Sequence, residues 1–292
     1  MNAIAFVLQT VRIAIPYLFA AAGGVMSERV GIIALGLEGM MLSGAFGAAL
    51  GSYYGGSPYF GLLGALVAGL LITSILAVAT LRFKANQVVV GVALNLLVVG
   101  VTRFFLRLTF DSASNSPRVP GFGSESGSAG MFASFLNPLV WLGLLVLPAL
   151  AWLLYRTPFG LRARAVGEKP EAAATLGINV VALRLRGLIL SGSLAALGGA
   201  YLALDQHQFT DGMTAGRGFI ALAAVIFGRW QPMRVAIACV LFAAAETLQI
   251  RLQGAQLVPS QFVEMIPYVL TIVALAGVVG RSVAPAALGK TE

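Results

Sequence analysis

A few ionisable and polar residues interrupt the long apolar stretches of this chain, and they are the first candidates for chemistry. The clearest is Glu38, in the stretch GIIALGLEGMML. A carboxylate at membrane depth is costly, so such groups face a bundle interior or a cavity. Glu38 therefore either lines a solute path or forms a structural hydrogen bond to a neighbouring helix or backbone amide. The glycines Gly31, Gly36 and Gly39 would let the backbone break or be closely approached there, as in the broken helices of solute carriers.

Five further positions are candidates for a path, a gate or a polar interior. Asn95, in GVALNLLVVG, either lines a path or links two helices by hydrogen bonds. Arg217 stands beside a short apolar segment with aspartates nearby, which predicts a role in an outer gate or a salt bridge. Glu246 and Gln249 share one helical face at i, i+3 spacing, and together with Glu264 they are candidates for a polar interior.

The chain carries no residue pattern that points to an enzyme. His207 is its only histidine and Cys239 its only cysteine, so a histidine triad, a histidine or cysteine metal cluster and a disulfide framework are excluded. The ending GKTE is similar to the end of a phosphate-binding loop, but Ala284 stands where its first glycine belongs. We therefore expect no catalytic residues, no cofactor and no metal.

A short hydrophilic segment, GEKPEAAATLGINV at residues 167–180, separates two apolar stretches. Pro170 suits the first turn of a helix, and Glu168 and Glu171 suit its positive end. Gly177 suits a helix stop. The pattern predicts about two helical turns over Pro170–Leu176, lying along the membrane surface.

This predicted helix presents a small apolar face made of Ala172, Ala173 and Leu176. Small side chains offer little area for anchoring in lipid. The face is better suited to docking in a groove of another protein. An ordinary amphipathic connector is the alternative interpretation.

The elements that must position these residues are membrane helices. The chain of 292 residues is 59% hydrophobic and only 10% charged, whereas soluble domains carry about a quarter charged residues. Its 35 glycines favour close helix packing, for which Gly47 with Gly51 and Ala65 with Gly69 are the clearest motifs. The net charge of +8 does not indicate nucleic-acid binding, because the basic residues fall mostly between apolar stretches.

Apolar runs of about 20 residues, the length that crosses a bilayer, predict the spans. They are Ile4–Val25, Gly31–Tyr53, Pro58–Leu81, Val88–Thr109, Pro138–Tyr155, Leu183–Leu204, Met233–Leu252 and Val263–Gly280. A shorter run, Phe219–Gly228, predicts a half-helix. The expected fold is an all-α integral membrane protein, a helical bundle of eight to nine transmembrane segments in one domain over residues 1–292.

The distribution of Lys and Arg predicts which connections lie in the cytoplasm. Arg82 and Lys84 follow the third span, and the loop 156–186 is the most basic of the chain. That loop carries Arg156, Arg162, Arg164, Lys169, Arg184 and Arg186 against two acidic residues. The connection 110–137 is rich in Ser and Gly with one Arg, which predicts an external loop. The C-terminal tail is then expected inside and the N-terminus outside.

Several stretches resemble those of one transporter family. GEKPEAAATLGINV resembles the coupling-helix loop of ABC importer permeases, with its Glu-Ala-Ala…Gly signature. Together with LRGLILSGSLAALGGAYLAL, it resembles the branched-chain amino acid/ribose permease superfamily. The stretches SERVGIIALGLEGMMLSGAFGA, ANQVVVGVALNLL, GMTAGRGFIALAAVIFGRWQP and VPSQFVEMIPYVLTIVALAG resemble its nucleoside, or simple-sugar, branch, which works with basic-membrane-protein-type lipoprotein receptors. One departure is Ala34-Leu35, where members of the branch often carry Asn-Ile.

The resemblance implies half of an importer in the bacterial cytoplasmic (inner) membrane. Its implied partners are a second homologous permease in a heterodimer, a cytoplasmic ABC ATPase and an extracytoplasmic solute-binding protein. Residues Glu168 to Gly177 would transmit closure of the ATPase, and Glu38, Asn95 and Arg217 would line or gate the path for purine or related nucleosides. Ribose-like sugars or branched-chain amino acids are alternative solutes. A secondary transporter driven by protons or sodium, with Glu38 as the coupling carboxylate, is the alternative mechanism.

Overall fold

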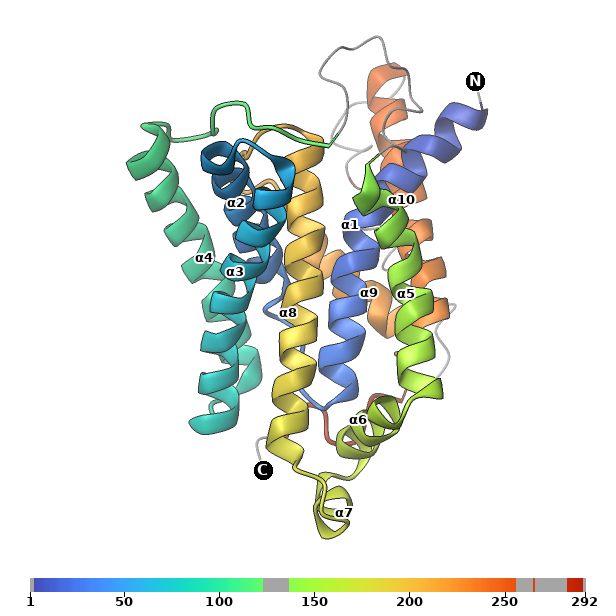
Figure 1. The fold of residues 1–292 in the computed structure, drawn as a ribbon. Coiled ribbons are helices and arrows are strands. Elements are labelled where there is room, and N and C mark those ends of the chain that lie inside the picture. Colours follow the sequence, from blue (N-terminus) through green and yellow to red (C-terminus); the bar gives the residue numbers. More distant parts are fainter. Residues whose placement is uncertain (1–2, 123–136, 256–264, 266–282, 291–292) are drawn as a thin grey trace.

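The computed structural model describes residues 3–122, 137–255, 265 and 283–290, and these residues are predominantly helical (Figure 1). The helices are, in chain order, α1 (Ala3–Arg29), α2 (Leu37–Gly55), α3 (Pro58–Ala77) continued by the π-helical turn η1 (Val78–Arg82), α4 (Gln87–Phe110), α5 (Pro138–Arg156), α6 (Pro158–Glu168), α7 (Pro170–Thr175), α8 (Val180–Asp205), α9 (Arg217–Phe227) and α10 (Pro232–Ala255). Apart from a single bridge between Asn115 and Thr210, the described ranges contain no β-structure. The all-α fold expected from the sequence is confirmed.

Six helices of the described part are long and apolar enough to cross a membrane: α1, α3 with η1, α4, α5, α8 and α10. The helix α9 has 11 residues and is too short to cross upright, in agreement with the short apolar helix predicted at residues 219–228. The predicted span Val263–Gly280 lies outside the described residues, as does Glu264. The predicted total of eight to nine segments is therefore not confirmed.

The start of the second predicted span, Gly31–Tyr53, is wrong by six residues. The helix α2 begins only at Leu37, and residues 31–36 form a non-helical break after α1. Gly31 opens this break with a φ of 91°, in the left-handed region that favours glycine. Residues 31–36 are as apolar as the helices on either side, so apolar content alone could not locate the break.

Close packing of small residues holds the centre of the bundle together. Gly199 of α8 lies so close to the Met41 carbonyl of α2 that an added Cβ would overlap it. Gly47 and Gly51 of α2 face the α3 backbone in the same way, as their GxxxG spacing predicted. Because lipid supplies no hydrophobic driving force between helices, such backbone approach is a main source of packing energy.

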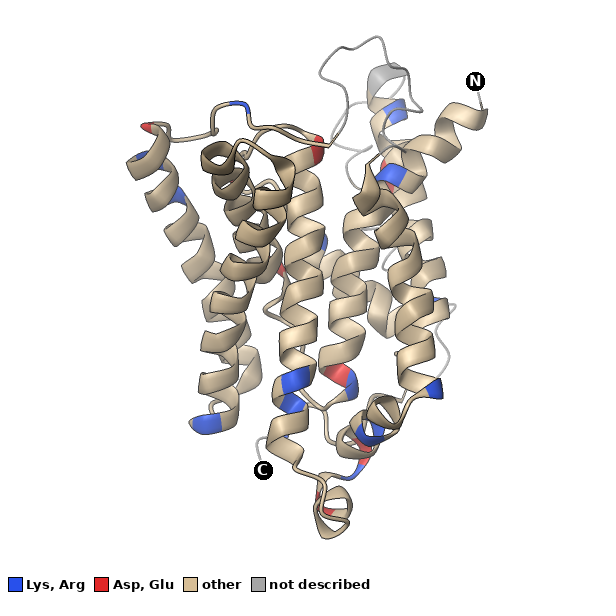
Figure 2. Cartoon of the chain, in the orientation of Figure 1, with Lys and Arg blue, Asp and Glu red and all other residues tan. Residues whose placement is uncertain are grey.

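Different elements lie at the two ends of the bundle, and charged residues gather near both (Figures 1 and 2). The short helices α6 and α7 and residues 283–290 lie at one end, which we call the α7 end. The start of α1 and residues 111–122 lie at the opposite end, which we call the N-terminal end. This arrangement agrees with the prediction that the loop 156–186 and the C-terminal tail share one side of the membrane, opposite the N-terminus and the described part of the 110–137 connection.

Candidate functional site

The N-terminus of the half-helix α9 is held by a carboxylate from α2. Glu38 Oε1 accepts hydrogen bonds from Thr214 Oγ1 at 2.6 Å and from the Gly216 N–H at 2.9 Å, and its Oε2 accepts one from the Gly218 N–H at 2.7 Å. The first N–H groups of a helix lack partners within the helix and carry partial positive charge, so a carboxylate stabilises them. These contacts fit the structural role that the sequence left open for Glu38.

Asn95 of α4 holds the start of α2, where Glu38 is located. Its Oδ1 accepts a hydrogen bond from the Gly39 N–H at 2.8 Å, and its Nδ2 donates one to the Leu35 carbonyl at 2.8 Å. A Cβ at Gly39 would lie 3.0 Å from Asn95 Oδ1, so glycine permits this approach. Asn95 thus links two helices, which is the second of the two roles expected for it.

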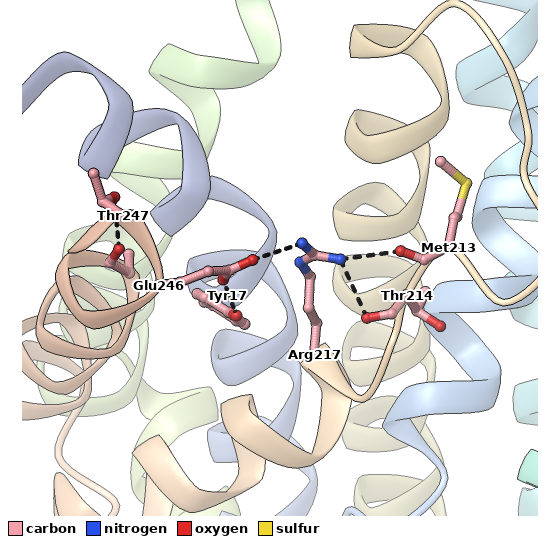
Figure 3. Close-up of polar contacts among 7 residues, drawn as sticks. Tyr17, Met213, Thr214, Arg217, Glu246 and Thr247 are labelled. Atoms are coloured by element: carbon pink, nitrogen blue, oxygen red, sulfur yellow. Dashed lines mark hydrogen bonds and ion pairs between the residues drawn. The ribbon is translucent and has the colours of Figure 1, made fainter. Parts of the chain in front are cut away.

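A half-buried ion pair joins α9 to α10 and α1 (Figure 3). Arg217 Nη2 lies 2.8 Å from Glu246 Oε1, and the Tyr17 hydroxyl donates a hydrogen bond to the other oxygen of Glu246. Arg217 Nη1 donates to the Met213 carbonyl at 3.0 Å. The salt bridge expected for Arg217 is present, but its partner is Glu246 rather than one of the nearby aspartates. Those aspartates, Asp205 and Asp211, pair with Arg12 and Arg103.

Three of the four predicted path residues therefore meet around the first turn of α9. Glu38 accepts hydrogen bonds from the backbone of that turn, and Glu246 pairs with Arg217, its first residue. Asn95 acts on this turn through α2, because it fixes the start of that helix, which carries Glu38. We call this group of side chains, with Tyr17, the α9 network.

Sequence reasoning missed the residues that stabilise the break after α1. Glu28 Oε1 accepts a hydrogen bond from the Ala34 N–H at 3.3 Å, and its Oε2 accepts one from Trp230 Nε1. Gln87 Oε1 accepts from the Ile33 N–H at 2.8 Å. Non-helical backbone inside a membrane protein needs such partners. Glu28 and Gln87 stand at the borders of apolar runs, where polar residues are ordinary, so their position gave little signal.

A cavity of about 380 Å³ lies beside the α9 network, between α1, α8 and α10. Its volume falls in the range of small-molecule sites. The polar residues in its wall include Gln9, Arg12, Tyr201, Asp205, Gln206 and Arg217. Arg12 Nη2 and Asp205 Oδ2 form an ion pair of 2.7 Å there. Within the described ranges, no three His, Cys, Asp or Glu side chains converge in a way that could hold a metal ion.

The predicted coupling helix is present as α7, which projects from the α7 end of the bundle (Figure 1). Ala172 and Leu176 are exposed, Leu176 to 81%. Ala173 is 2% exposed, so its inclusion in the exposed apolar face was wrong. At i, i+1 spacing Ala172 and Ala173 point in different directions, and the short helix turns Ala173 toward the rest of the chain.

The other predicted coupling residues lie within α7 or directly beside it. Gly177 has a φ of 76°, as its predicted role in stopping the helix requires. Glu171 lies exposed in the first turn. Glu168, the last residue of α6, accepts a hydrogen bond through its Oε2 from the Ala286 N–H at 3.3 Å.

Residues 283–290 connect the α6–α7 junction with the break after α1. The Ala287 N–H donates a hydrogen bond to the Gly167 carbonyl at 2.9 Å, and the Gly289 N–H donates one to the Gly31 carbonyl at 3.2 Å. Ala287 is 1% exposed. The α7 end is therefore tied by backbone hydrogen bonds to the segment that leads into α2.

Comparison with known proteins gives matches over nearly the whole chain. Residues 6–275 match the family described as branched-chain amino acid transport system / permease component. The chain is 39% identical to the guanosine ABC transporter permease protein NupQ of Bacillus subtilis (strain 168), over 94% of this chain and 92% of that protein. It is 37% identical, with the same coverage of both chains, to the nucleoside ABC transporter permease protein NupC of Lactococcus lactis subsp. cremoris (strain MG1363).

One solved structure has a similar fold. It is described as an inward-facing conformation of a putative metal-chelate type ABC transporter, and it matches with a TM-score of 0.52 and 16% sequence identity. The match covers 93% of this chain and 85% of that one. At this identity the similarity concerns the fold alone.

Proposed function

Because this chain belongs to the family of branched-chain amino acid transport system permease components, we propose that it is the membrane-spanning subunit of an ABC importer that carries nucleosides into the cell. The observation that carries the proposal is the near full-length similarity to two permeases named for guanosine and for nucleosides. Members of this family are transporters rather than enzymes, and six apolar helices make this chain a multi-pass membrane protein. Its location is the cytoplasmic (inner) membrane of a bacterium.

The partners follow from this role. A second, homologous permease completes the translocation unit as a heterodimer. An ABC ATPase binds the cytoplasmic side and supplies the energy, so this chain itself hydrolyses no ATP. A solute-binding protein delivers the nucleoside to the external side. In this proposal the α7 end faces the cytoplasm and the N-terminal end faces outside, and the basic residues of the loop 156–186 support this orientation.

The helix α7 docks in the ATPase. It projects beyond the bundle, and Ala172 and Leu176 offer a small exposed apolar surface. The hydrogen bonds of residues 283–290 tie the base of α7 to the break after α1. Movement of α7 would therefore be transmitted toward the start of α2 and the α9 network.

Substitution of Ala172 by Arg tests this docking, because a long charged side chain cannot enter an apolar groove without cost. Nucleoside uptake should fall to background while the protein remains in the membrane. Ala113→Arg is the matched control, since Ala113 is exposed at the opposite end, and its uptake should stay near wild type. If Ala172→Arg transports normally, α7 does not dock in the ATPase.

The α9 network borders the solute path, and Glu38, Asn95, Arg217 and Glu246 act as its wall or gate. Glu38, Arg217 and Glu246 form hydrogen bonds or ion pairs at the start of α9, and Asn95 fixes the start of α2, the helix that carries Glu38. The contacts of Glu38 also favour an ATP-driven mechanism over a proton-coupled one. Its two oxygens accept three hydrogen bonds from Thr214 and the start of α9, so this carboxylate has a structural role, and the family match is to permeases that work with an ATPase.

Uptake by cells lacking the gene for this chain tests the solute class. Uptake of radiolabelled guanosine should be lost on deletion and restored by the wild-type gene, and unlabelled nucleosides should compete with it. Ribose and leucine uptake in the same cells should not change. Unchanged guanosine uptake with loss of ribose or leucine uptake would assign the other solute class and refute the proposal.

A further inference from the structure

The hydroxyl of Tyr201, in the wall of the 380 Å³ cavity, lacks a hydrogen-bond partner among the described residues. The residue is 2% exposed, and its hydroxyl, although close to Arg12, makes no hydrogen bond of normal geometry with any described residue. Buried hydroxyl groups are nearly always hydrogen-bonded, because leaving one without a partner is destabilising. A solute in the cavity could supply the missing partner.

The Arg12–Asp205 pair provides further hydrogen-bonding capacity on the same wall. Their 2.7 Å bond joins one Arg12 nitrogen to Asp205 Oδ2, and the side chains are 41% and 16% exposed. A guanidinium has five N–H donors and a carboxylate about four acceptor positions, so one bond leaves both groups with unused capacity. Together with the Tyr201 hydroxyl, the wall offers both donors and acceptors over a short distance.

The charges of the cavity favour a neutral ligand. Arg12 is paired with Asp205, and Arg217 is paired with Glu246, so neither guanidinium needs an anion. Arg251 lies over the ring of Phe6, 5.3 Å from its centroid, which partly offsets its charge. Apolar residues such as Ile13 and Pro16 complete the wall. This combination suits a hydroxylated, uncharged ring better than a phosphate.

The cavity also has a suitable position in the bundle. The helix α8 runs from the α7 end to the N-terminal end, and Asp205 is its last residue (Figure 1). Arg217, on the inner side, belongs to the α9 network. A solute that enters from the N-terminal end would therefore meet the Arg12–Asp205 pair before it meets α9.

We propose that this cavity is an outer binding site for the transported solute, and that Tyr201, Arg12 and Asp205 recognise the vicinal hydroxyls of its sugar ring. A carboxylate can accept two hydrogen bonds from neighbouring hydroxyls, while a guanidinium donates to their oxygens. The proposal rests on the proposed function for the assignment of the solute as a nucleoside. Free ribose carries the same pair of hydroxyls, so the experiment has to separate these two sources.

Protection of an introduced cysteine measures occupation of the cavity without transport. Cys239, the native cysteine, is fully buried, so it does not compete for a thiol reagent. Gln9→Cys places a thiol in the half-buried wall of the cavity. In the purified transporter complex in nanodiscs, saturating guanosine should slow its labelling at least threefold. Labelling of Ala113→Cys, at an exposed position outside the cavity, should not change.

Removal of the Tyr201 hydroxyl tests the recognition itself. Tyr201→Phe should raise the guanosine concentration that half-protects Gln9→Cys about fivefold, the factor expected for one hydrogen bond, and should leave that for 2′,3′-dideoxyguanosine unchanged. Tyr54→Phe, at a residue 71% exposed, should change neither concentration. If Tyr201→Phe does not yield folded protein, the cysteine protection decides alone.

The outcomes separate the two proposals. Normal guanosine uptake without protection of Gln9→Cys, or an equal effect of Tyr201→Phe on both nucleosides, overturns the cavity site and leaves the importer function intact. Conversely, a complex that transports ribose and no nucleoside refutes the nucleoside assignment. Protection of Gln9→Cys by ribose in that complex would still support the cavity as a site for vicinal hydroxyls.

Discussion

Replacement of Glu38 by Ala should destabilise the protein strongly, because this carboxylate accepts three hydrogen bonds at the start of α9. The Gly218 N–H is buried and would lose its partner, at about 2 kcal/mol by the usual cost of an unsatisfied buried donor. The half-buried Gly216 N–H and the lost capping of the helix add about 1 kcal/mol. Loss of the hydrogen bond from the Thr214 hydroxyl adds about 1.5 kcal/mol, so the free energy of unfolding should fall by about 4.5 kcal/mol in total.

The thermal unfolding midpoint of the purified protein in detergent measures this change. A loss of 1 kcal/mol lowers the midpoint by about 2–4 °C in chains of 150–250 residues, so Glu38→Ala should lower it by about 9 °C or more. Glu38→Gln keeps the shape and one acceptor oxygen, and it should lose roughly half as much. Glu171→Ala is the matched control, because Glu171 is exposed on α7 and should shift the midpoint by less than about 2 °C.

A double-mutant cycle with Thr214 tests the cause of the loss. The Thr214 hydroxyl donates to Glu38 Oε1 at 2.6 Å, so Thr214→Val should be destabilising in the wild-type chain and nearly neutral after Glu38→Ala. The expected coupling energy is about 1.5 kcal/mol, typical of a hydrogen bond to a charged group. A Glu38→Ala midpoint within 1 °C of wild type, or additive effects in the cycle, would refute the reasoning.

Two further stability predictions use the same thermal assay. Arg217→Met leaves the half-buried Glu246 carboxylate without its cation, and the free energy of unfolding should fall by about 2 kcal/mol. The double variant with Glu246→Leu should recover part of this loss of stability. An equal or larger loss in the double variant would contradict this account of the ion pair. Gly199→Ala forces α8 away from the Met41 carbonyl and should yield little folded protein. Gly100→Ala is the control, because an added Cβ there meets no atom within 4 Å, and it should be neutral or stabilising. A normal yield of Gly199→Ala would show that this helix contact is not needed.

The sequence predicted most of the described bundle because long apolar runs have few structural alternatives in a membrane. The spans that became α3, α5, α8 and α10 were located to within a few residues. The break at residues 31–36 was harder to place. Its glycines indicated that the backbone could leave the helix, but not which side chains stabilise it: Glu28 lies at the end of α1, directly before the break, and Gln87 comes from the start of α4.

The members of the α9 network were visible in the sequence, but their pairing was not. Glu38, Arg217 and Glu246 stood out because charges are rare in apolar runs. Glu38 and Gly218 are 180 residues apart, and Tyr17 and Glu246 are 229 residues apart, so local spacing could not connect them. Tyr17 itself gave no signal, since an aromatic residue in an apolar run is ordinary. The exposure of Ala173 was misjudged because a two-turn helix does not determine which face packs on its own chain.

Reconstituted transport tests the central claim most directly. Proteoliposomes would contain this permease, its homologous partner and the ABC ATPase, with the solute-binding protein on the outside and either ATP or a proton gradient as the energy source. The account predicts that guanosine accumulates with ATP, does not accumulate with the proton gradient alone, and fails to accumulate when this chain is left out. Accumulation driven by the proton gradient without ATP would contradict it.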